Sequence, residues 1–275
     1  MRLGISSWTY PWAIGVAGFP PPQRSFRLTD LLRRASLLRV GVVQVADNLP
    51  LDKLDPGEIR DARDLAVSLG LTIEVGTRGV QPAHLLHYLS FARTFGATLV
   101  RTLIDSTDSR PPLNQAEKCI REVLPEFEAH GVTIGIENYE AHSCSSLADL
   151  VRRLESTHVG ICLDTVNSLG ALETPEPVVE TLAPLTVCLH VKDFAMDRTA
   201  HRMGFAVRGA PAGKGRLDIP WILRQLPANK NVSVILEQWP PWDTSVEKSI
   251  LIEQEWAEQG VEYLRACGLA TPNEV

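Results

Sequence analysis

Several features that would place a chain in a common class of protein are missing from this sequence. No run of about 18 apolar residues occurs, and the first ten residues lack the apolar core of a signal peptide, so we expect a cytoplasmic protein that does not enter a membrane. There is no stripe of lysine and arginine, and the formal net charge is −6, which argues against nucleic acid as a partner.

Cysteine is scarce, and its spacing excludes two further classes. The five cysteines form no CxxC pair and no zinc-ribbon pattern. Cys162 and Cys188 fall within predicted core strands, where a reduced thiol behaves as a small apolar side chain. We therefore expect a cytosolic protein with reduced cysteines.

Short aliphatic runs alternate with amphipathic runs through nearly the full length of the chain. This alternation is typical of strands followed by helices. Eight such strand–helix units predict a single (β/α)8 TIM barrel over residues 1–275. The expected strands are Leu3–Ser7, Val40–Ala46, Leu71–Gly76, Thr98–Ile104, Thr133–Asn138, Val159–Asp164, Thr186–Lys192 and Ser233–Gln238, and the expected helices cover residues 28–38, 56–69, 81–95, 114–130, 145–156, 175–183, 218–226 and 246–267.

An open, doubly wound sheet is the competing architecture. It would use fewer strands and usually a glycine-rich first turn, and the GISSW segment at residues 4–8 is not a GxGxxG motif. Two long loops, an aromatic lid loop at 8–26 and a second loop at 193–218, each follow a predicted strand. Both would lie over the C-terminal mouth of a barrel, where barrel enzymes keep their active sites.

Four polar residues each end a short aliphatic run. Glu137 ends TIGIE, Asp164 ends VGICLD, His190 ends TVCLH, and Glu237 ends SVILE. Successive side chains of a strand point to opposite faces, and the residues of opposite parity in these runs are the bulky ones. The four polar side chains would therefore share the inner face of a barrel at one end, which predicts a metal site at its mouth.

The same alternation assigns faces to the residues around His190. Thr186 and Cys188 share its parity and would point into the barrel, whereas Val187 would face the helices. Lys192 also shares this parity. We expect Lys192 to reach the site and to take part in catalysis.

With these residues at its strand ends, the sequence resembles the sugar phosphate isomerase/epimerase family of the xylose-isomerase-like TIM barrel superfamily. The resemblance extends from GISSW at the first strand to ILEQW at the eighth. Its motifs are specific as a set, although each would be weak alone. They are IEN (136–138), LDTVN (163–167), HVKD (190–193) and GKGRLD (213–218).

The resemblance implies a fold, a cofactor and two catalytic roles. In this family the residues that match Glu137, Asp164, His190 and Glu237 bind one divalent cation. The two glutamates also exchange the proton of the substrate carbon, which implies that Glu137 and Glu237 act as acid and base as well as ligands.

Three positions depart from the family pattern. Asn167 stands where the strand-six motif DxxH commonly has histidine, and Gln44 stands where the second strand commonly ends in glutamate. Lys214 lies between two glycines, where the family commonly has an acid. Each departure removes negative charge or basicity, so the fold and the metal carry over more safely than the reaction.

Three carboxylates and one imidazole suit Mn²⁺ or Mg²⁺ best, and Co²⁺ and Zn²⁺ are also compatible with them. We expect a metal-dependent isomerase or epimerase that acts next to the carbonyl of a small keto sugar or sugar acid through a metal-stabilised enediolate. The alternative is a metal-dependent decarboxylase or dehydratase of an oxo sugar acid such as 3-oxo-isoapionate, in carbohydrate catabolism. The missing DxxH histidine and the added lysine favour this alternative.

The local charge pattern predicts a small anionic or polyhydroxylated substrate. Basic residues gather in the loop over the mouth of an otherwise acidic protein, and arginine recognises carboxylates bidentately. The direction in which Arg101 points stays open. The residues expected to contact substrate are Trp8 and Trp12 as an apolar wall, together with Asn167, His142, Arg208, Lys214 and Arg216.

Two other functions fit the sequence less well. An endonuclease of the abasic-site-cleaving type would carry more histidine and acidic ligands and a basic face for DNA, and neither is visible. A barrel that only binds a ligand would not need an intact set of four metal-ligand residues. A homo-oligomer is compatible with the sequence, which does not specify it.

Overall fold

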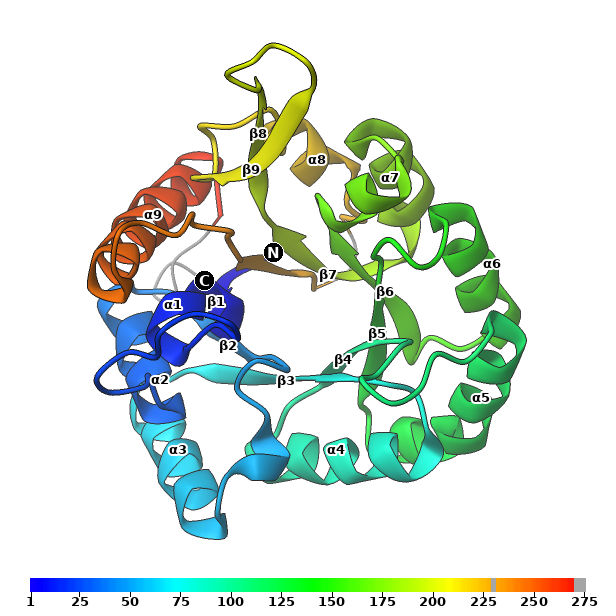
Figure 1. The fold of residues 1–275 in the computed structure, drawn as a ribbon. Helices are drawn as coiled ribbons and strands as arrows, with labels where there is room; N and C mark the ends of the chain where they lie inside the picture. Colours follow the sequence, from blue (N-terminus) through cyan, green and yellow to red (C-terminus); the bar gives the residue numbers. More distant parts are fainter. Residues whose placement is uncertain (229–230, 270–275) are drawn as a thin grey trace.

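Eight parallel strands close into a barrel within residues 1–228 and 231–269, which the computed structural model describes (Figure 1). This confirms the expected TIM-barrel architecture, and every strand begins and ends within two residues of its predicted limits. In order around the barrel, the strands are β1 (Arg2–Ser6), β2 (Val42–Val45), β3 (Thr72–Arg78), β4 (Leu99–Leu103), β5 (Thr133–Glu137), β6 (Val159–Asp164), β7 (Thr186–Val191) and β10 (Ser233–Leu236).

Helices surround the barrel as an outer ring (Figure 1). The eight expected helices are present, and α1 is an additional short one in the aromatic lid loop. No helix in the described part of the chain is both long and apolar enough to span a bilayer. The helices are α1 (Pro11–Ile14), α2 (Leu28–Leu37), α3 (Pro56–Ser68), α4 (Pro82–Phe95), α5 (Leu113–Ala129), α6 (Cys144–Leu154), α7 (Pro175–Leu182), α8 (Ile219–Gln225) and α9 (Val246–Ala266).

Apolar side chains pack on both faces of the barrel strands. On the outer face, bulky residues such as Ile134 and Leu163 are fully buried against the helices. Each such burial contributes roughly 1.5–3 kcal/mol, so the large outer cluster stabilises the fold without disulfides. A smaller second cluster consists of Val42, Leu99, Cys162, Cys188 and Ile235, with Val187 packed against it.

Strand β7 departs from the predicted alternation because it contains a bulge. The pairing with β6 shifts register there, and Val187 is left without a paired residue. Thr186 donates a hydrogen bond to the backbone of α7, while Val187 packs on Gly160 of β6, where an added Cβ would lie 2.5 Å from it. The predicted orientations of Thr186 and Val187 were therefore wrong. The bulge precedes Cys188, so His190 keeps its predicted direction.

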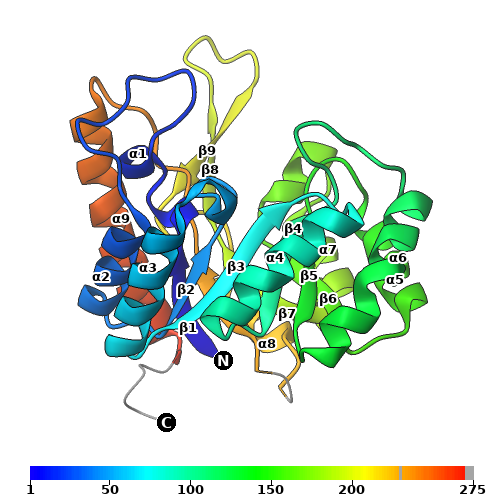
Figure 2. The ribbon, with the colours of Figure 1, turned by 90° about the horizontal axis from the view of Figure 1, so that it is seen from below.

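The long loop at 193–218 contains regular structure that its sequence did not reveal. Strands β8 (Asp193–Arg198) and β9 (Phe205–Ala210) pair as an antiparallel hairpin. In Figure 2 this hairpin projects at the same end of the barrel as α1, opposite the N-terminus of the chain. The loop therefore lies at the C-terminal mouth, but its tip extends away from the barrel.

The aromatic lid loop is fixed to α9 by a buried carboxylate. Glu253 is fully buried and accepts hydrogen bonds from the backbone N–H groups of Trp12 (2.7 Å) and Ala13 (2.8 Å) in α1. The Trp12 ring packs against Phe19 and Trp242, with centroid separations of 4.9 and 5.3 Å. This anchoring holds the lid loop beside the barrel mouth.

The buried carboxylate makes stability depend on pH. Burial raises the pKa of Glu253 from 4.5 to about 8, so the folded protein binds this proton more tightly than the unfolded chain does. The resulting stability is fully present below pH 4.5 and is lost as the pH rises to about 8. Between pH 5 and pH 8.5, we expect the wild type to lose about 4 kcal/mol more unfolding free energy in urea than Glu253→Gln. Equal losses in the two proteins would contradict this assignment.

Candidate active site

Four side chains from different strands meet at the C-terminal mouth of the barrel: Glu137, Asp164, His190 and Glu237. All four are at most 1% exposed. The Nδ1 atom of His190 lies 3.4 Å from Oε2 of Glu137, 3.5 Å from Oε2 of Glu237 and 3.9 Å from Oδ2 of Asp164. We refer to these four residues as the quartet. They come from β5, β6, β7 and the residue that follows β10, so the closure of the barrel brings them together.

Two buried cations balance the charge of the quartet. Lys192 places Nζ 2.6 Å from Oδ2 of Asp164 and 3.0 Å from Oε2 of Glu237. On the other side, Arg101 of β4 forms a short ion pair with Glu137 and a second one, at 3.0 Å, with Asp47. Isolated buried carboxylates would be very costly, so these ion pairs allow the quartet to exist within the fold.

The same contacts shift the pKa values of the site. Burial alone would lower the pKa of His190, but the carboxylates of Glu237 and Glu137 outweigh it and raise the pKa well above its usual value. Burial alone would raise the pKa of Glu137, but Arg101 and His190 hold it well below its usual range. The carboxylates around the His190 imidazole therefore strongly favour a positive charge between them.

Neutral side chains fix the directions of the two glutamate carboxylates. Ser6 donates a hydrogen bond to Oε1 of Glu237 (2.7 Å), and the amide of Asn167 donates to Oε1 of Glu137 (2.8 Å). In both glutamates the other oxygen, Oε2, is the one that faces His190. The site is thus preorganised, because its charged groups are held in place before any ligand arrives.

The quartet fits a divalent cation. His190 Nδ1 is buried and has no hydrogen-bond partner among the described residues, although three carboxylates surround it. Ligand atoms of Glu137, Asp164 and His190 all lie within 4.8 Å of one another. A buried polar atom of this kind is costly unless something binds it. Carboxylate oxygens with one imidazole nitrogen form a donor set suited to Mn²⁺, Mg²⁺, Co²⁺ or Zn²⁺.

A cavity of about 190 Å³ lies over the quartet. Trp8 and Trp239 contribute aromatic surface, and the Lys192 ammonium lies 5.7 Å from the centre of the Trp239 ring. Three cationic side chains share the lining with several acidic ones. The lining residues are Trp8, Asp47, Arg78, Arg101, Leu103, Glu137, Tyr139, Glu140, Asn167, Lys192 and Trp239.

Five residues expected to contact substrate are not part of this lining. Trp12 is buried in the lid loop, where its Nε1 donates to the Pro240 carbonyl at 2.9 Å. His142 is 3.9 Å from Asp105. Arg208 is exposed on the hairpin, where it pairs with Asp197 at 2.6 Å. Lys214 and Arg216 are exposed on the segment after the hairpin. A role for these five in substrate binding stays a prediction.

Sequence reasoning missed several residues of the cavity. The predicted site contains neither Asp47 nor Arg78, and the sequence does not set the direction of Arg101. Asp47 follows β2 closely and Arg78 ends β3, so both lie at the C-terminal ends of strands, as the quartet does. A polar residue at the C-terminal end of a barrel strand is the signal that indicates the quartet, and the same signal is present at Asp47 and Arg78.

Asp193 organises the GKGRLD motif beside the site. Its buried carboxylate accepts hydrogen bonds from the backbone N–H groups of Gly213 (3.0 Å), Gly215 (2.9 Å), Arg216 (3.0 Å) and Leu217 (3.2 Å). A Cβ on Gly215 would lie 2.1 Å from the carboxylate, so only glycine allows this close approach. The aspartate of HVKD therefore ties the segment after the hairpin to the end of β7.

A closed parallel barrel with charged side chains gathered at the C-terminal ends of its strands defines the class of TIM-barrel enzymes. Within that class, this chain belongs to the xylose isomerase-like TIM barrel family, whose sequence profile matches residues 76–267. It is 34% identical over 265 residues to the 3-oxo-isoapionate decarboxylase of Pectobacterium atrosepticum, an alignment that covers 96% of this chain and 95% of the relative.

Solved structures agree with this fold. D-psicose 3-epimerase from Clostridium cellulolyticum H10, solved with D-tagatose, superposes with a TM-score of 0.71 and 16% identity over 97% of this chain and 99% of the epimerase. A xylose isomerase-like TIM barrel protein from Mycobacterium smegmatis, solved in complex with magnesium, gives a TM-score of 0.67 and 16% identity over 98% of each chain. At these identities the similarity establishes the architecture.

The Asp193 contacts predict an effect on stability. Asp193→Asn replaces one acceptor oxygen by an N–H₂ group that must face N–H donors, so we expect the free energy of unfolding to fall by about 2–3 kcal/mol. Proteolysis within residues 211–217 should also become faster, which mass spectrometry of the fragments would locate. The matched control is Asp197→Asn, since the Asp197 side chain is exposed and forms a surface ion pair with Arg208. Its effect should stay below about 0.5 kcal/mol. Similar effects of the two variants would contradict the assignment.

Proposed function

We propose that this protein is a divalent-metal-dependent decarboxylase of a small 3-oxo sugar acid, such as 3-oxo-isoapionate, in carbohydrate catabolism. The observation that carries the proposal is the set of three cations in the cavity over the quartet: Arg78, Arg101 and Lys192. The similarity to a 3-oxo-isoapionate decarboxylase over almost the whole chain supports it independently.

The cations differ in what they can offer a substrate. Arg101 is 3% exposed and is engaged by Glu137 and Asp47. Arg78 is 43% exposed, and its ion pair with Asp47, at 3.6 Å, is long. Arg78 is therefore the group that would hold the substrate carboxylate, because a guanidinium binds a carboxylate bidentately. Lys192 is paired with Asp164 and Glu237, and it would add a point charge once a divalent cation takes over those two carboxylates.

The quartet would hold the cation, through Glu137, Asp164, His190 and Glu237. When bound there, a divalent cation would polarise the 3-oxo group and stabilise negative charge on its oxygen. The aromatic rings of Trp8 and Trp239 would offer apolar surface to the C–H groups of a bound substrate.

Lys192 has a second role in this reaction. Decarboxylation breaks the bond between the carboxyl carbon and the α-carbon, carbon dioxide leaves, and the electron pair of that bond delocalises onto the 3-oxo oxygen. The α-carbon must then take up a proton. A lysine that holds the departing carboxylate is on the correct face to donate this proton, and solvent returns a proton to Lys192 afterwards.

An isomerase or epimerase is the second candidate. Glu137 and Glu237 approach the same nitrogen of His190 at 3.4 and 3.5 Å from different strands, an arrangement in which one carboxylate could remove a proton and the other return it. Asn167 favours the decarboxylase, because the amide that binds Glu137 cannot carry a proton as the histidine of a DxxH motif can.

The first experiment follows the bond that breaks. Purified protein loaded with Mn²⁺ should release carbon dioxide from a 3-oxo sugar acid, and in D₂O the product should carry one deuterium on the former α-carbon. Glu237→Gln should lower kcat/KM at least about 100-fold and reduce the bound metal, with an unchanged circular dichroism spectrum. Glu180→Gln is the control, since Glu180 is exposed on α7 and is not part of the cavity lining. Interconversion of keto sugars without release of carbon dioxide would establish the isomerase instead.

The second experiment tests which cation recognises the carboxylate. Arg78→Gln should raise KM for the 3-oxo acid about 10- to 100-fold, as expected for the loss of a charge-assisted contact of roughly 1.5–3 kcal/mol, with a smaller effect on kcat. Lys214→Ala is the comparison, because Lys214 lies outside the cavity lining. A larger rise in KM for Lys214→Ala than for Arg78→Gln would assign recognition to the loop.

A further inference from the structure

A polar contact reaches the quartet from beneath, inside the barrel. The side chain of Gln44 on β2 is fully buried, and its Oε1 atom lies 2.7 Å from Nε2 of His190. The amide nitrogen of Gln44 lies 3.0 Å from Oε2 of Glu74 on β3, which is 2% exposed. Glu74, Gln44 and His190 therefore form a continuous hydrogen-bonded chain that ends at the quartet.

The chemistry of a carboxylate fixes the direction of this chain. A carboxylate only accepts hydrogen bonds, so the N–H₂ end of Gln44 must face Glu74 and its carbonyl oxygen must face His190. That oxygen requires a proton on Nε2 of the imidazole. The other nitrogen, Nδ1, then directs its lone pair at the carboxylates of the quartet when it carries no proton. Cys162 Sγ, 3.2 Å from Nε2, is a weaker acceptor.

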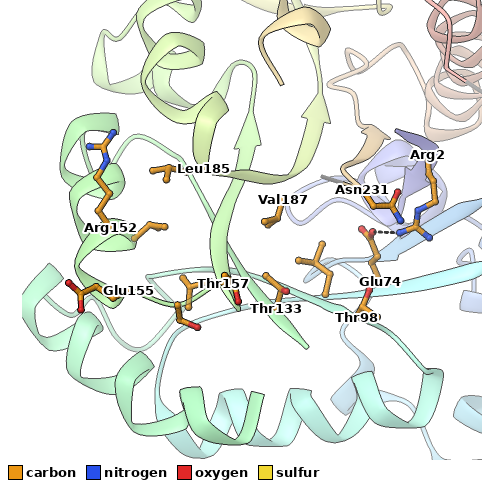
Figure 3. Close-up of a pocket in the computed structure, with 14 residues that line it drawn as sticks. Arg2, Glu74, Thr98, Thr133, Arg152, Glu155, Thr157, Leu185, Val187 and Asn231 are labelled. Atoms are coloured by element: carbon orange, nitrogen blue, oxygen red, sulfur yellow. Dashed lines mark ion pairs between the residues drawn. The ribbon is translucent and has the colours of Figure 1, made fainter. Parts of the chain in front are cut away.

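The Glu74 end of this hydrogen-bonded series lies at a different cavity. A space of about 640 Å³, drawn in Figure 3, has Glu74 and Arg2 among its lining residues. Arg2 Nη2 lies 3.8 Å from Oε1 of Glu74, which supports the ionised carboxylate. Burial raises the pKa of Glu74 to about 7, so the carboxylate form predominates at pH 8.

We propose that Gln44 and Glu74 are positioning residues that hold Nε2–H of His190 and thereby direct Nδ1 at the cation site of the quartet. The inference rests on the metal site of the proposed function. It assigns a role to two residues that belong neither to the quartet nor to the lining of the cavity above it. The carboxylate of Glu74 lies one residue further from the imidazole than Gln44 and acts on it through the Gln44 amide.

Metal affinity at pH 8, measured with Mn²⁺ by electron paramagnetic resonance, tests the proposal without any activity assay. Gln44→Leu should weaken Mn²⁺ binding about 10- to 100-fold, because the imidazole loses its acceptor. Glu74→Gln should weaken it about fivefold, since two facing amides no longer fix which end of Gln44 meets His190. Cys162→Ala is the matched control at the other neighbour of Nε2, with a change below about threefold expected.

A double variant gives the most specific test of the proposed roles of Gln44 and Glu74. Gln44→Glu combined with Glu74→Gln exchanges the amide and the carboxylate, so His190 donates directly to a carboxylate that the new amide supports. Net charge and side-chain size are preserved, and Mn²⁺ affinity should return to within about threefold of wild type. A purely structural role for the two positions would not produce this rescue. The double variant and Glu74→Gln also carry the test if Gln44→Leu does not fold.

A spectroscopic readout separates this inference from the proposed function. In protein labelled with ¹⁵N-histidine, the Nε2–H proton of His190 should give an exchange-protected downfield resonance, which Gln44→Leu abolishes and the double variant restores. Wild-type protein that binds no Mn²⁺ would contradict the proposed metal site alone, because this resonance still reports on Gln44. An unchanged resonance and affinity in folded Gln44→Leu, a larger loss for Cys162→Ala, or a double variant without rescue would overturn the proposal.

Discussion

The concentration of negative charge around one buried imidazole nitrogen is the constraint on which the rest of the structure depends. Glu137, Asp164 and Glu237 all approach Nδ1 of His190, and all four side chains are at most 1% exposed. Such an arrangement is unstable in isolation, because each buried carboxylate costs several kcal/mol. Arg101 and Lys192 offset part of that cost. Nδ1 of His190, which has no hydrogen-bond partner within residues 1–228 and 231–269, marks where a divalent cation would offset more of it.

The barrel makes this concentration of charge feasible. Its strands carry their bulky residues towards the helices, so the hydrophobic free energy that holds the fold comes from outside the site. Inside, small residues such as Gly135 and Gly160 lie below the polar layer, and the bulged Val187 packs over them. The interior can therefore accommodate a second polar layer, in which Gln44 and Glu74 support His190 from the opposite side.

How far the sequence predicts the structure depends on the kind of residue. Strand and helix limits were predicted well, because burial on one face imposes a period that is visible in the chain. Parity also indicated the direction of the quartet residues. It failed at Val187, because a bulge depends on the packing between neighbouring strands, which a single run does not encode. The hairpin of β8 and β9 was missed for a similar reason, as its short strands pair mostly with each other and are largely exposed.

The sequence by itself determined the fold class, the family resemblance and the four residues at the ends of the strands. The tertiary structure decided which charged groups share their space. Arg78, Arg101 and Asp47 enter the cavity because the second, third and fourth strands lie beside the site in the closed barrel. Lys214 and Arg216 lie outside its lining, although the sequence predicts that their loop lies over the barrel mouth. The reason is physical: periodicity specifies which face a side chain occupies, whereas distances between strands far apart in the sequence arise only when the barrel closes.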